Sequence, residues 1–200
     1  MKALSRRIIL AGSAAVLSGL TVGAAVKFLP QTKNPAQPSI ADIGGDFSLS
    51  GGDGKTVSSQ DFRGQYMLIY FGYTHCPDVC PTTLSNMAAA LDALGPVERK
   101  KITPVFITVD PERDTPKIAG DYAHAFGPEF IGLSGSLGDI GKVADEYRVF
   151  FEKRYLKSGD YSMDHSSILY VMGPQGTLAG ILPADLDPKD LAQRLQALGV

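Results

Sequence analysis

The 200-residue chain has no tryptophan, only two cysteines and only three histidines, and it contains no low-complexity tract and no internal repeat. Its lysines and arginines form no basic stripe. Nucleic acid is therefore excluded as a partner, because phosphate binding depends on clustered Lys and Arg side chains. The remaining composition, 44% hydrophobic and 20% charged, is ordinary for a soluble α/β protein and allows one globular domain with a single core.

The N-terminal segment combines basic charge with hydrophobicity. Lys2, Arg6 and Arg7 precede an uncharged stretch of 19 residues, Ile8 to Val26. As a helix this stretch spans roughly 28 Å, at about 1.5 Å per residue, which is close to the thickness of the hydrocarbon core of a bilayer. By the positive-inside rule, the residues after this stretch lie outside the cytoplasm.

These features predict the domain organisation. We expect residues 1–28 to be an N-terminal transmembrane helix that anchors the chain, or else a signal segment removed at the small residues 22–25. Residues 29–39 contain three prolines among polar neighbours and predict an extended linker. Residues 40–200 form the folded domain. The predicted location is the bacterial inner membrane, with a single pass and the C-terminal domain in the periplasm.

Hydrophobic patterning predicts alternating strands and helices. Tyr66 to Phe71 is a continuous apolar run, as expected for a strand covered on both faces. The apolar spacing from Val79 to Leu94 predicts an amphipathic helix that Gly95 and Pro96 close. Further strands are predicted over 102–109, 149–155, 167–172 and 177–182, and further helices over 116–126, 137–147 and 188–198. This order predicts an α/β, thioredoxin-like fold with a central mixed β-sheet flanked by helices.

The two cysteines lie at the junction of the first central strand and its helix. Cys76 and Cys80 are four residues apart, so in a first helical turn their sulfurs converge. The rise of about 6 Å over four helical residues also permits a disulfide. A helix N-terminus favours thiolates and lowers their pKa values. Metal binding, thiol exchange and a structural disulfide all stay open, although bridging so short a loop adds little stability.

A metal site needs a donor beyond the two sulfurs, and two thiolates with one imidazole suit Cu(I) and also serve Cu(II). His165 is the best third ligand, because it lies in a polar turn before a predicted strand; a solvated loop histidine has about equal weight. Asp164 or another carboxyl or carbonyl group is expected to orient its ring. His75 adjoins Cys76, but neighbouring side chains on a turn diverge. His124 lies inside a helical pattern, where packing or solvation is expected.

At this point the chain resembles the Sco/SenC family of copper chaperones for cytochrome oxidase. Three segments in order carry the resemblance: the Cys-x-x-x-Cys segment 71–81 (FGYTHCPDVCP), the acidic loop 109–116 (VDPERDTP) and the histidine motif 164–166 (DHS). The resemblance runs from about position 47 to position 200. Asp78, Asp110 and Asp114 are also similar to the family, and they are expected either to form part of a partner-docking or Cu(II)-handling surface or to be solvated.

The resemblance implies a function and a ligand set. Cys76, Cys80 and His165 are the implied copper ligands, and the implied fold is thioredoxin-like with an N-terminal membrane anchor. The implied acceptor is the binuclear copper centre of cytochrome c oxidase subunit II or another apo copper protein. Such a metallochaperone need not be an enzyme.

Other functions compete with this one. A thiol-disulfide oxidoreductase would use Cys76 and Cys80 as a redox-active pair, keep the acceptor's cysteines reduced and draw on a periplasmic thiol reductase. Dedicated dithiol enzymes of this fold usually separate their cysteines by two residues, and they do not need His165. A copper or redox sensor that uses the same couple stays open. A peroxidase is disfavoured, because the chain has no Trp and pairs its cysteines closely.

Overall fold

The computed structural model describes residues 43–200, and the predicted anchor (1–28) and linker (29–39) lie outside them. Within residues 43–200, no helix is both long enough and apolar enough to cross a membrane.

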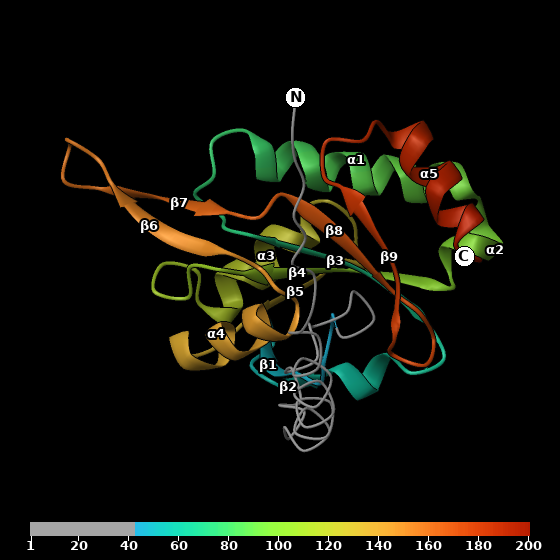
Figure 1. The fold of residues 1–200 in the computed structure, drawn as a ribbon, viewed down its shortest axis with the longest axis horizontal. Helices are drawn as coiled ribbons and strands as arrows, with labels where there is room; N and C mark the ends of the chain where they lie inside the picture. The colour runs from blue at the N-terminus through green and yellow to red at the C-terminus, as the bar shows by residue number, and fades with distance from the viewer. Residues whose placement is uncertain (1–42) are drawn as a thin grey trace, which may run out of the picture. The chain divides into compact units, whose positions relative to one another are not determined.

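A seven-stranded mixed sheet forms the centre of the described domain (Figure 1), with the strand order β2-β1-β5-β4-β3-β8-β9. Its strands are β1 (Ser48–Gly51), β2 (Thr56–Ser58), β3 (Tyr66–Gly72), β4 (Ile102–Thr108), β5 (Ile131–Ser134), β8 (Ile168–Met172) and β9 (Leu178–Pro183). β4 runs parallel to β3 and β5, whereas β8 is antiparallel to β3, and β1 is antiparallel to β5. The predicted central mixed sheet is confirmed.

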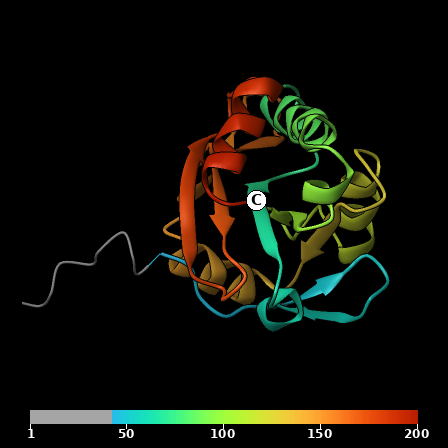
Figure 2. The same cartoon turned by 90° about the vertical axis from the view of Figure 1, so that its right-hand side faces the viewer.

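Helices cover both faces of the sheet (Figure 2). They are α1 (Val79–Leu94), α2 (Pro96–Arg99), α3 (Pro116–His124), α4 (Leu137–Glu146) and α5 (Pro188–Ala197), with a 3-10 turn η3 (Ser59–Phe62) before β3. The crossovers β3-α1-β4 and β4-α3-β5 join parallel neighbours and proceed in one direction across the sheet. Because such crossovers are right-handed as a rule, α1 and α3 share a face. α5 packs against α1 on that face, and α4 covers the other.

Side chains of the central strands show the two faces directly. The ring centroid of Phe106 on β4 lies 5.2 Å from that of Tyr122 on α3. On the opposite face, the ring centroid of Phe71 on β3 lies 5.5 Å from that of Tyr147, which follows α4. Phe71, Phe106 and Ile69 are completely buried. β3 is therefore covered on both sides, as its continuous apolar run predicts.

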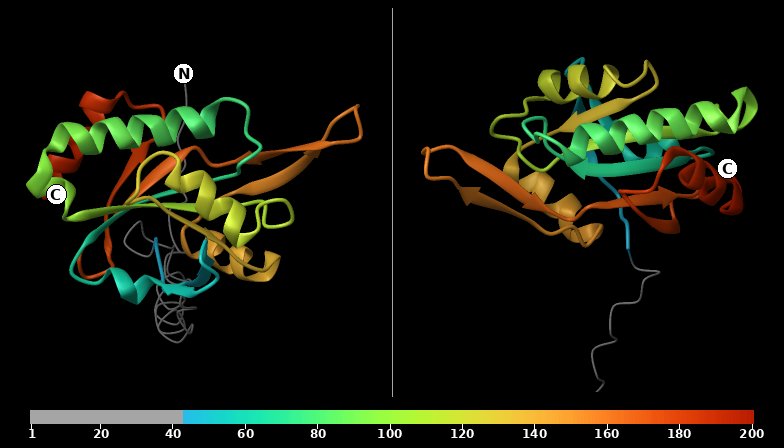
Figure 3. Two further views of the ribbon diagram at one scale, coloured as in Figure 1. Left: turned by 180° about the vertical axis from the view of Figure 1, so that it is seen from behind. Right: turned by 90° about the horizontal axis from the view of Figure 1, so that it is seen from above.

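A separate two-stranded sheet, β6 (Phe151–Tyr155) with β7 (Tyr161–His165), projects from the central sheet as a hairpin (Figure 3). The polar turn predicted around His165 is wrong. His165 is instead the last residue of β7 and is paired with Phe151 of β6. The polar sequence of β7 (YSMDH) gives no clear strand signal, and pairing with β6 stabilises it. β1, β2 and β5 were also missed, since strands of three or four residues are too short for a periodic pattern.

Candidate functional site

The loop between β3 and α1 carries both cysteines, and both are free thiols. Asp78 is the N-cap of α1, yet its carboxylate makes no capping hydrogen bond. The backbone N–H of Cys80 donates instead to Sγ of Cys76, at 3.4 Å. A sulfur thus accepts one of the N–H groups that a helix start leaves free, and it does so best as a thiolate.

The two thiols differ in acidity. Partial burial by itself raises the pKa of Cys76, but the N–H groups of Asp78, Cys80 and Val79 outweigh it, so the pKa of this thiol is lowered. Cys80 is completely buried, and this burial raises its pKa to about 12. Cys76 is therefore the nucleophilic, half-buried sulfur, and Cys80 keeps its proton until something replaces it.

Two residues at the end of β3, Tyr70 and Gly72, lie against the Cys80 sulfur. The hydroxyl of Tyr70 donates to Sγ of Cys80 at 3.6 Å. A Cβ at Gly72 would lie 3.0 Å from the same sulfur, so only glycine leaves room for it. Neither residue was predicted as part of the site. Strand alternation carries the signal, because Tyr70 and Gly72 point to the face that α1 covers.

His165 meets the cysteines from the end of the hairpin. Its Nε2 lies 3.5 Å from Sγ of Cys80. Its Nδ1 lies 3.0 Å from the carbonyl oxygen of Ser166, and because a carbonyl only accepts, Nδ1 carries the proton and Nε2 keeps a free lone pair. The predicted orienting group is thus this carbonyl, while Asp164 pairs with Arg154.

Aromatic rings surround the imidazole. Its ring centroid lies 6.0 Å from that of Tyr70 and 5.8 Å from that of Tyr73, both edge-on. Burial lowers the pKa of His165, so the ring is neutral near neutral pH. A neutral imidazole with a free Nε2 beside a thiol is suited to bind a soft metal ion.

The other two histidines lie elsewhere. The ring Nδ1 of His75 is 3.1 Å from Oγ1 of Thr74 and 3.7 Å from a carboxylate oxygen of Asp114. His124 is exposed at the last position of α3.

The three aspartates that the family resemblance singled out differ in exposure. Asp78 is exposed, but Asp110 and Asp114 are only 1% and 0% exposed, so the expectation of solvated carboxylates is wrong for these two. Asp110 accepts hydrogen bonds from Arg113 and from the hydroxyl of Tyr161. These partners and those of Asp114 offset the cost of burying the charges.

An open hollow of about 410 Å³ lies beside Cys76 and His165. It is lined by Tyr73, Cys76, Pro77, Val79, Ser162, Met163, Asp164, His165 and Ser167. Within residues 43–200, no three His, Cys, Asp or Glu side chains are already gathered into a group that could hold a metal ion. Instead, the Cys76 sulfur contacts the backbone N–H of Cys80, and the Cys80 sulfur contacts Nε2 of His165.

A mixed sheet flanked by helices, with a dithiol at the start of the helix after a central strand, defines a thioredoxin-like protein. Comparison with known sequences narrows this class. The sequence model described as SCO1/SenC matches residues 35–199, and the chain belongs to that family.

Similar proteins agree with this assignment. The chain is 45% identical over 135 residues to "Protein SCO1 homolog 1, mitochondrial" of Arabidopsis thaliana; the match covers 68% of this chain and only 40% of that protein. Its fold is similar to the crystal structure of Arabidopsis thaliana ScoI with copper bound, with a TM-score of 0.74 and 40% identity over 78% of this chain and 97% of that one. It is also similar to Bradyrhizobium japonicum ScoI with copper bound, with a TM-score of 0.71 and 42% identity over 78% and 99% of the two chains.

Proposed function

We propose that this chain is a copper chaperone that binds copper through Cys76, Cys80 and His165 and passes it to an acceptor protein. The observation that carries the proposal is the 3.5 Å separation of Cys80 Sγ and His165 Nε2 beside the Cys76 sulfur. Two soft sulfurs and one imidazole nitrogen fit Cu(I), and they also serve Cu(II). The copper-bound structures of two proteins at 40% and 42% identity support the same cargo.

The three donors have different parts in this function. His165 offers the lone pair of Nε2 without first losing a proton. Cys76, whose pKa is lowered, binds as a thiolate, whereas Cys80 must exchange its proton for the metal ion. Copper binding therefore releases protons. Because Cys76 and His165 border the open hollow while Cys80 is buried, they are the ligands that the donor atoms of an acceptor reach first in a stepwise exchange.

The proposed acceptor is the binuclear copper centre of cytochrome c oxidase subunit II, or another apo copper protein. In this proposal residues 1–28 hold the chain in the bacterial inner membrane and residues 29–39 space it from the bilayer. Residues 40–200 then present the copper site in the periplasm.

Copper titration of the reduced, metal-free chain tests the ligand set. We expect one tightly bound copper per chain, with affinity lost in Cys76→Ser, Cys80→Ser and His165→Ala. Loss of a direct ligand should exceed the roughly 10- to 100-fold cost of losing an outer-shell partner. His124, an exposed histidine, offers a matched control, since His124→Ala should bind copper as the unchanged chain does. Unchanged binding in His165→Ala would remove this residue from the site.

A second candidate function is thiol-disulfide exchange, favoured by the unequal thiols. Cys76, with its lowered pKa, would attack a disulfide of the acceptor, and buried Cys80 would resolve the mixed disulfide. The acceptor gains two thiols, while Cys76 and Cys80 become a disulfide that a periplasmic thiol reductase must reduce. This activity should survive in His165→Ala, and Cys80→Ser should trap the mixed disulfide. A copper or redox sensor would use the same couple without transfer to an acceptor.

A further inference from the structure

The hairpin that carries His165 has little support of its own. Among residues 43–200, β6 and β7 pair only with each other, in a two-stranded sheet separate from the seven-stranded one. An isolated two-stranded hairpin is at best marginally stable in water. The position of His165 against Cys80 therefore depends on contacts between the hairpin and the rest of the domain.

Met163 of β7 is buried in the core, and polar contacts from the acidic loop converge on Tyr161, which lies on the same face of β7 as His165. Arg113, in the acidic loop, donates from Nη1 to the carbonyl oxygen of Tyr161 at 3.0 Å, and its guanidinium carbon lies 3.7 Å from the centre of the Tyr161 ring. The hydroxyl of Tyr161 donates to Oδ1 of Asp110 at 2.9 Å. Nε of Arg113 donates to Oδ2 of the same carboxylate. One largely buried ion pair is therefore hydrogen-bonded to Tyr161 at its backbone carbonyl and at its hydroxyl.

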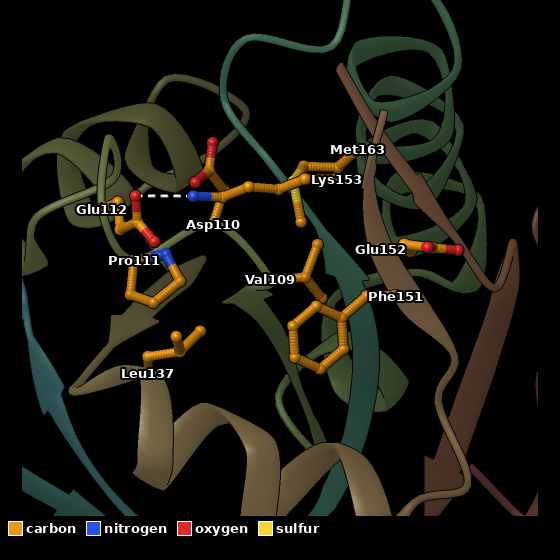
Figure 4. A pocket seen from close by; sticks show the side chains of 9 residues that line it. All are labelled: Val109, Asp110, Pro111, Glu112, Leu137, Phe151, Glu152, Lys153 and Met163. Carbon is orange, nitrogen blue, oxygen red and sulfur yellow. Dashed lines mark ion pairs between the residues drawn. The ribbon is translucent and has the colours of Figure 1, made fainter. Parts of the chain in front are cut away.

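A second contact joins the same loop to β6. A hollow of about 260 Å³ lies between loop and hairpin. Lys153 reaches across it to Glu112 (Figure 4). The ion pair is 2.6 Å long, and the ammonium group lies 4.6 Å from the centre of the Tyr161 ring. This pair is partly exposed and contributes less than the buried contacts of Arg113.

The other end of the loop holds the segment before Cys76. The carboxylate of Asp114 accepts hydrogen bonds from the backbone N–H of Thr74, at 2.9 Å, and from the hydroxyls of Thr74 and Thr108. Thr74 is two residues before Cys76. Residues 110–114 thus contact both strands of the hairpin and the cysteine loop, and they lie between the two halves of the site.

Arg113 also reaches the ring that borders the imidazole. Its guanidinium carbon lies 5.9 Å from the centre of the Tyr73 ring, which packs edge-on against His165. Its Nη2 is buried with no hydrogen-bond partner among the described residues, which costs free energy.

We propose that Arg113, paired with Asp110, is a positioning residue that holds the β6-β7 hairpin so that His165 stays within reach of Cys80. The proposal rests on the copper function proposed above and assigns to the acidic loop a role inside the protein. Arg113 touches neither the metal ligands nor the hollow beside them. It acts on His165 through Tyr161 and Tyr73.

The first arm of the test uses the metal-free chain, so it does not depend on copper binding. In Arg113→Ala, backbone amides of β6 and β7 should exchange hydrogen about tenfold faster or more, because a charged hydrogen bond and its stacking are lost. NMR contacts between the rings of Tyr73 and His165 should weaken. Arg113→Lys, which keeps the charge but not the planar fork, should lie between Arg113→Ala and the unchanged chain.

The matched control is Arg99→Ala. Arg113 pairs with the carboxylates of Asp110 and Asp160, and Arg99 likewise joins two carboxylates, those of Asp92 and Glu129, but away from the hairpin. It should leave exchange in β6 and β7 unchanged. Equal exchange in the hairpins of Arg113→Ala and the unchanged chain would overturn the proposal whatever the chain does with copper.

The second arm measures copper affinity in a double-mutant cycle. Arg113→Ala should lower copper affinity, and the double variant Arg113→Ala/His165→Ala should bind no more weakly than His165→Ala alone. Additive losses would show that Arg113 does not act through His165 and would overturn the proposal. If the unchanged chain binds no copper, the copper function fails, and the exchange measurements still decide whether Arg113 positions the hairpin.

Discussion

Sγ of Cys80 and Nε2 of His165 lie 3.5 Å apart, although 85 positions separate the two residues in the chain. Cys80 is brought there by the start of α1, and His165 by the last position of β7. One sulfur is buried beneath Tyr70 and Gly72, while the other caps the helix from a half-buried position. The site therefore depends on close packing as much as on its ligands, and packing changes should alter it.

The two cysteines should react at different rates with a thiol reagent. In the reduced, metal-free chain, Cys76 should be alkylated first, and its rate should already be substantial below pH 9, the ordinary pKa of a thiol, because its own pKa is lowered. Cys80 should stay protected throughout, since it is buried and its pKa is raised to about 12. Peptide mapping by mass spectrometry gives both rates. Faster labelling of Cys80 would contradict the assignment of Cys76 as the exposed, acidic sulfur.

Stability of the metal-free chain should depend on pH through His165. Its pKa is lowered from 6.5 by burial, so between the folded and unfolded pKa values the unfolded chain binds more protons. The free energy of unfolding should therefore rise with pH across this window and lose that contribution as pH falls below 6.5. Urea unfolding at a series of pH values measures it. The pH-dependent part should vanish in His165→Ala and persist in His124→Ala; the same slope in both variants would argue against a buried, neutral His165.

Gly72→Ala should disturb the site through the Cys80 sulfur. The new methyl group would lie 3.0 Å from this sulfur and 2.9 Å from the Tyr70 ring, so both must shift. Overpacking of this kind costs about 1–3 kcal/mol of unfolding free energy. We also expect weaker copper binding and faster alkylation of Cys80. Gly138→Ala, whose nearest neighbour beyond the adjoining residues is a side-chain oxygen at 3.8 Å, is the matched control; equal effects of the two substitutions would contradict the close fit.

Gly132→Ala should be the more damaging glycine substitution for the fold itself. A Cβ on β5 would stand 2.0 Å from the backbone carbonyl oxygen of Ala119 on α3, and backbone cannot swing aside. We expect a loss of about 3 kcal/mol or more in the free energy of unfolding. Gly141→Ala on α4 meets no atom of the described residues within 4 Å and should instead add about 0.5–1 kcal/mol to the free energy of unfolding, because alanine favours a helix. Chemical denaturation of both variants measures the contrast, which would fail if Gly132→Ala were tolerated.

Local sequence signals account for the half of the site that holds the cysteines. The apolar run before Gly72 predicts a strand buried on both faces, and the spacing from Val79 to Leu94 predicts a helix over the residues observed. Both patterns act over a few residues, so they do not depend on the rest of the fold. The placement of Cys76 and Cys80 at the junction between strand and helix follows from them directly.

The second half of the site lies beyond local signals. β7 is polar and forms a strand only because β6 pairs with it, so its sequence predicts a turn at His165. The polar sequence around Asp110 and Asp114 predicts solvated carboxylates, yet tertiary contacts bury both side chains. No short-range pattern reports a hydrogen bond such as that from Tyr161 to Asp110, which spans 51 residues.

By itself, the sequence determined four strands of the central sheet (β3, β4, β8 and β9), the longer helices (α1, α3, α4 and α5), the convergence of the two thiols at a helix start, and the segments that mark the family. Those features depend on periodicity and on residues close together in the chain. Only the tertiary structure decided that His165 contacts Cys80, that the Ser166 carbonyl sets the tautomer of His165, and that Arg113 is hydrogen-bonded to the hairpin. These contacts join distant segments, and their geometry exists only once the sheet and the hairpin have packed.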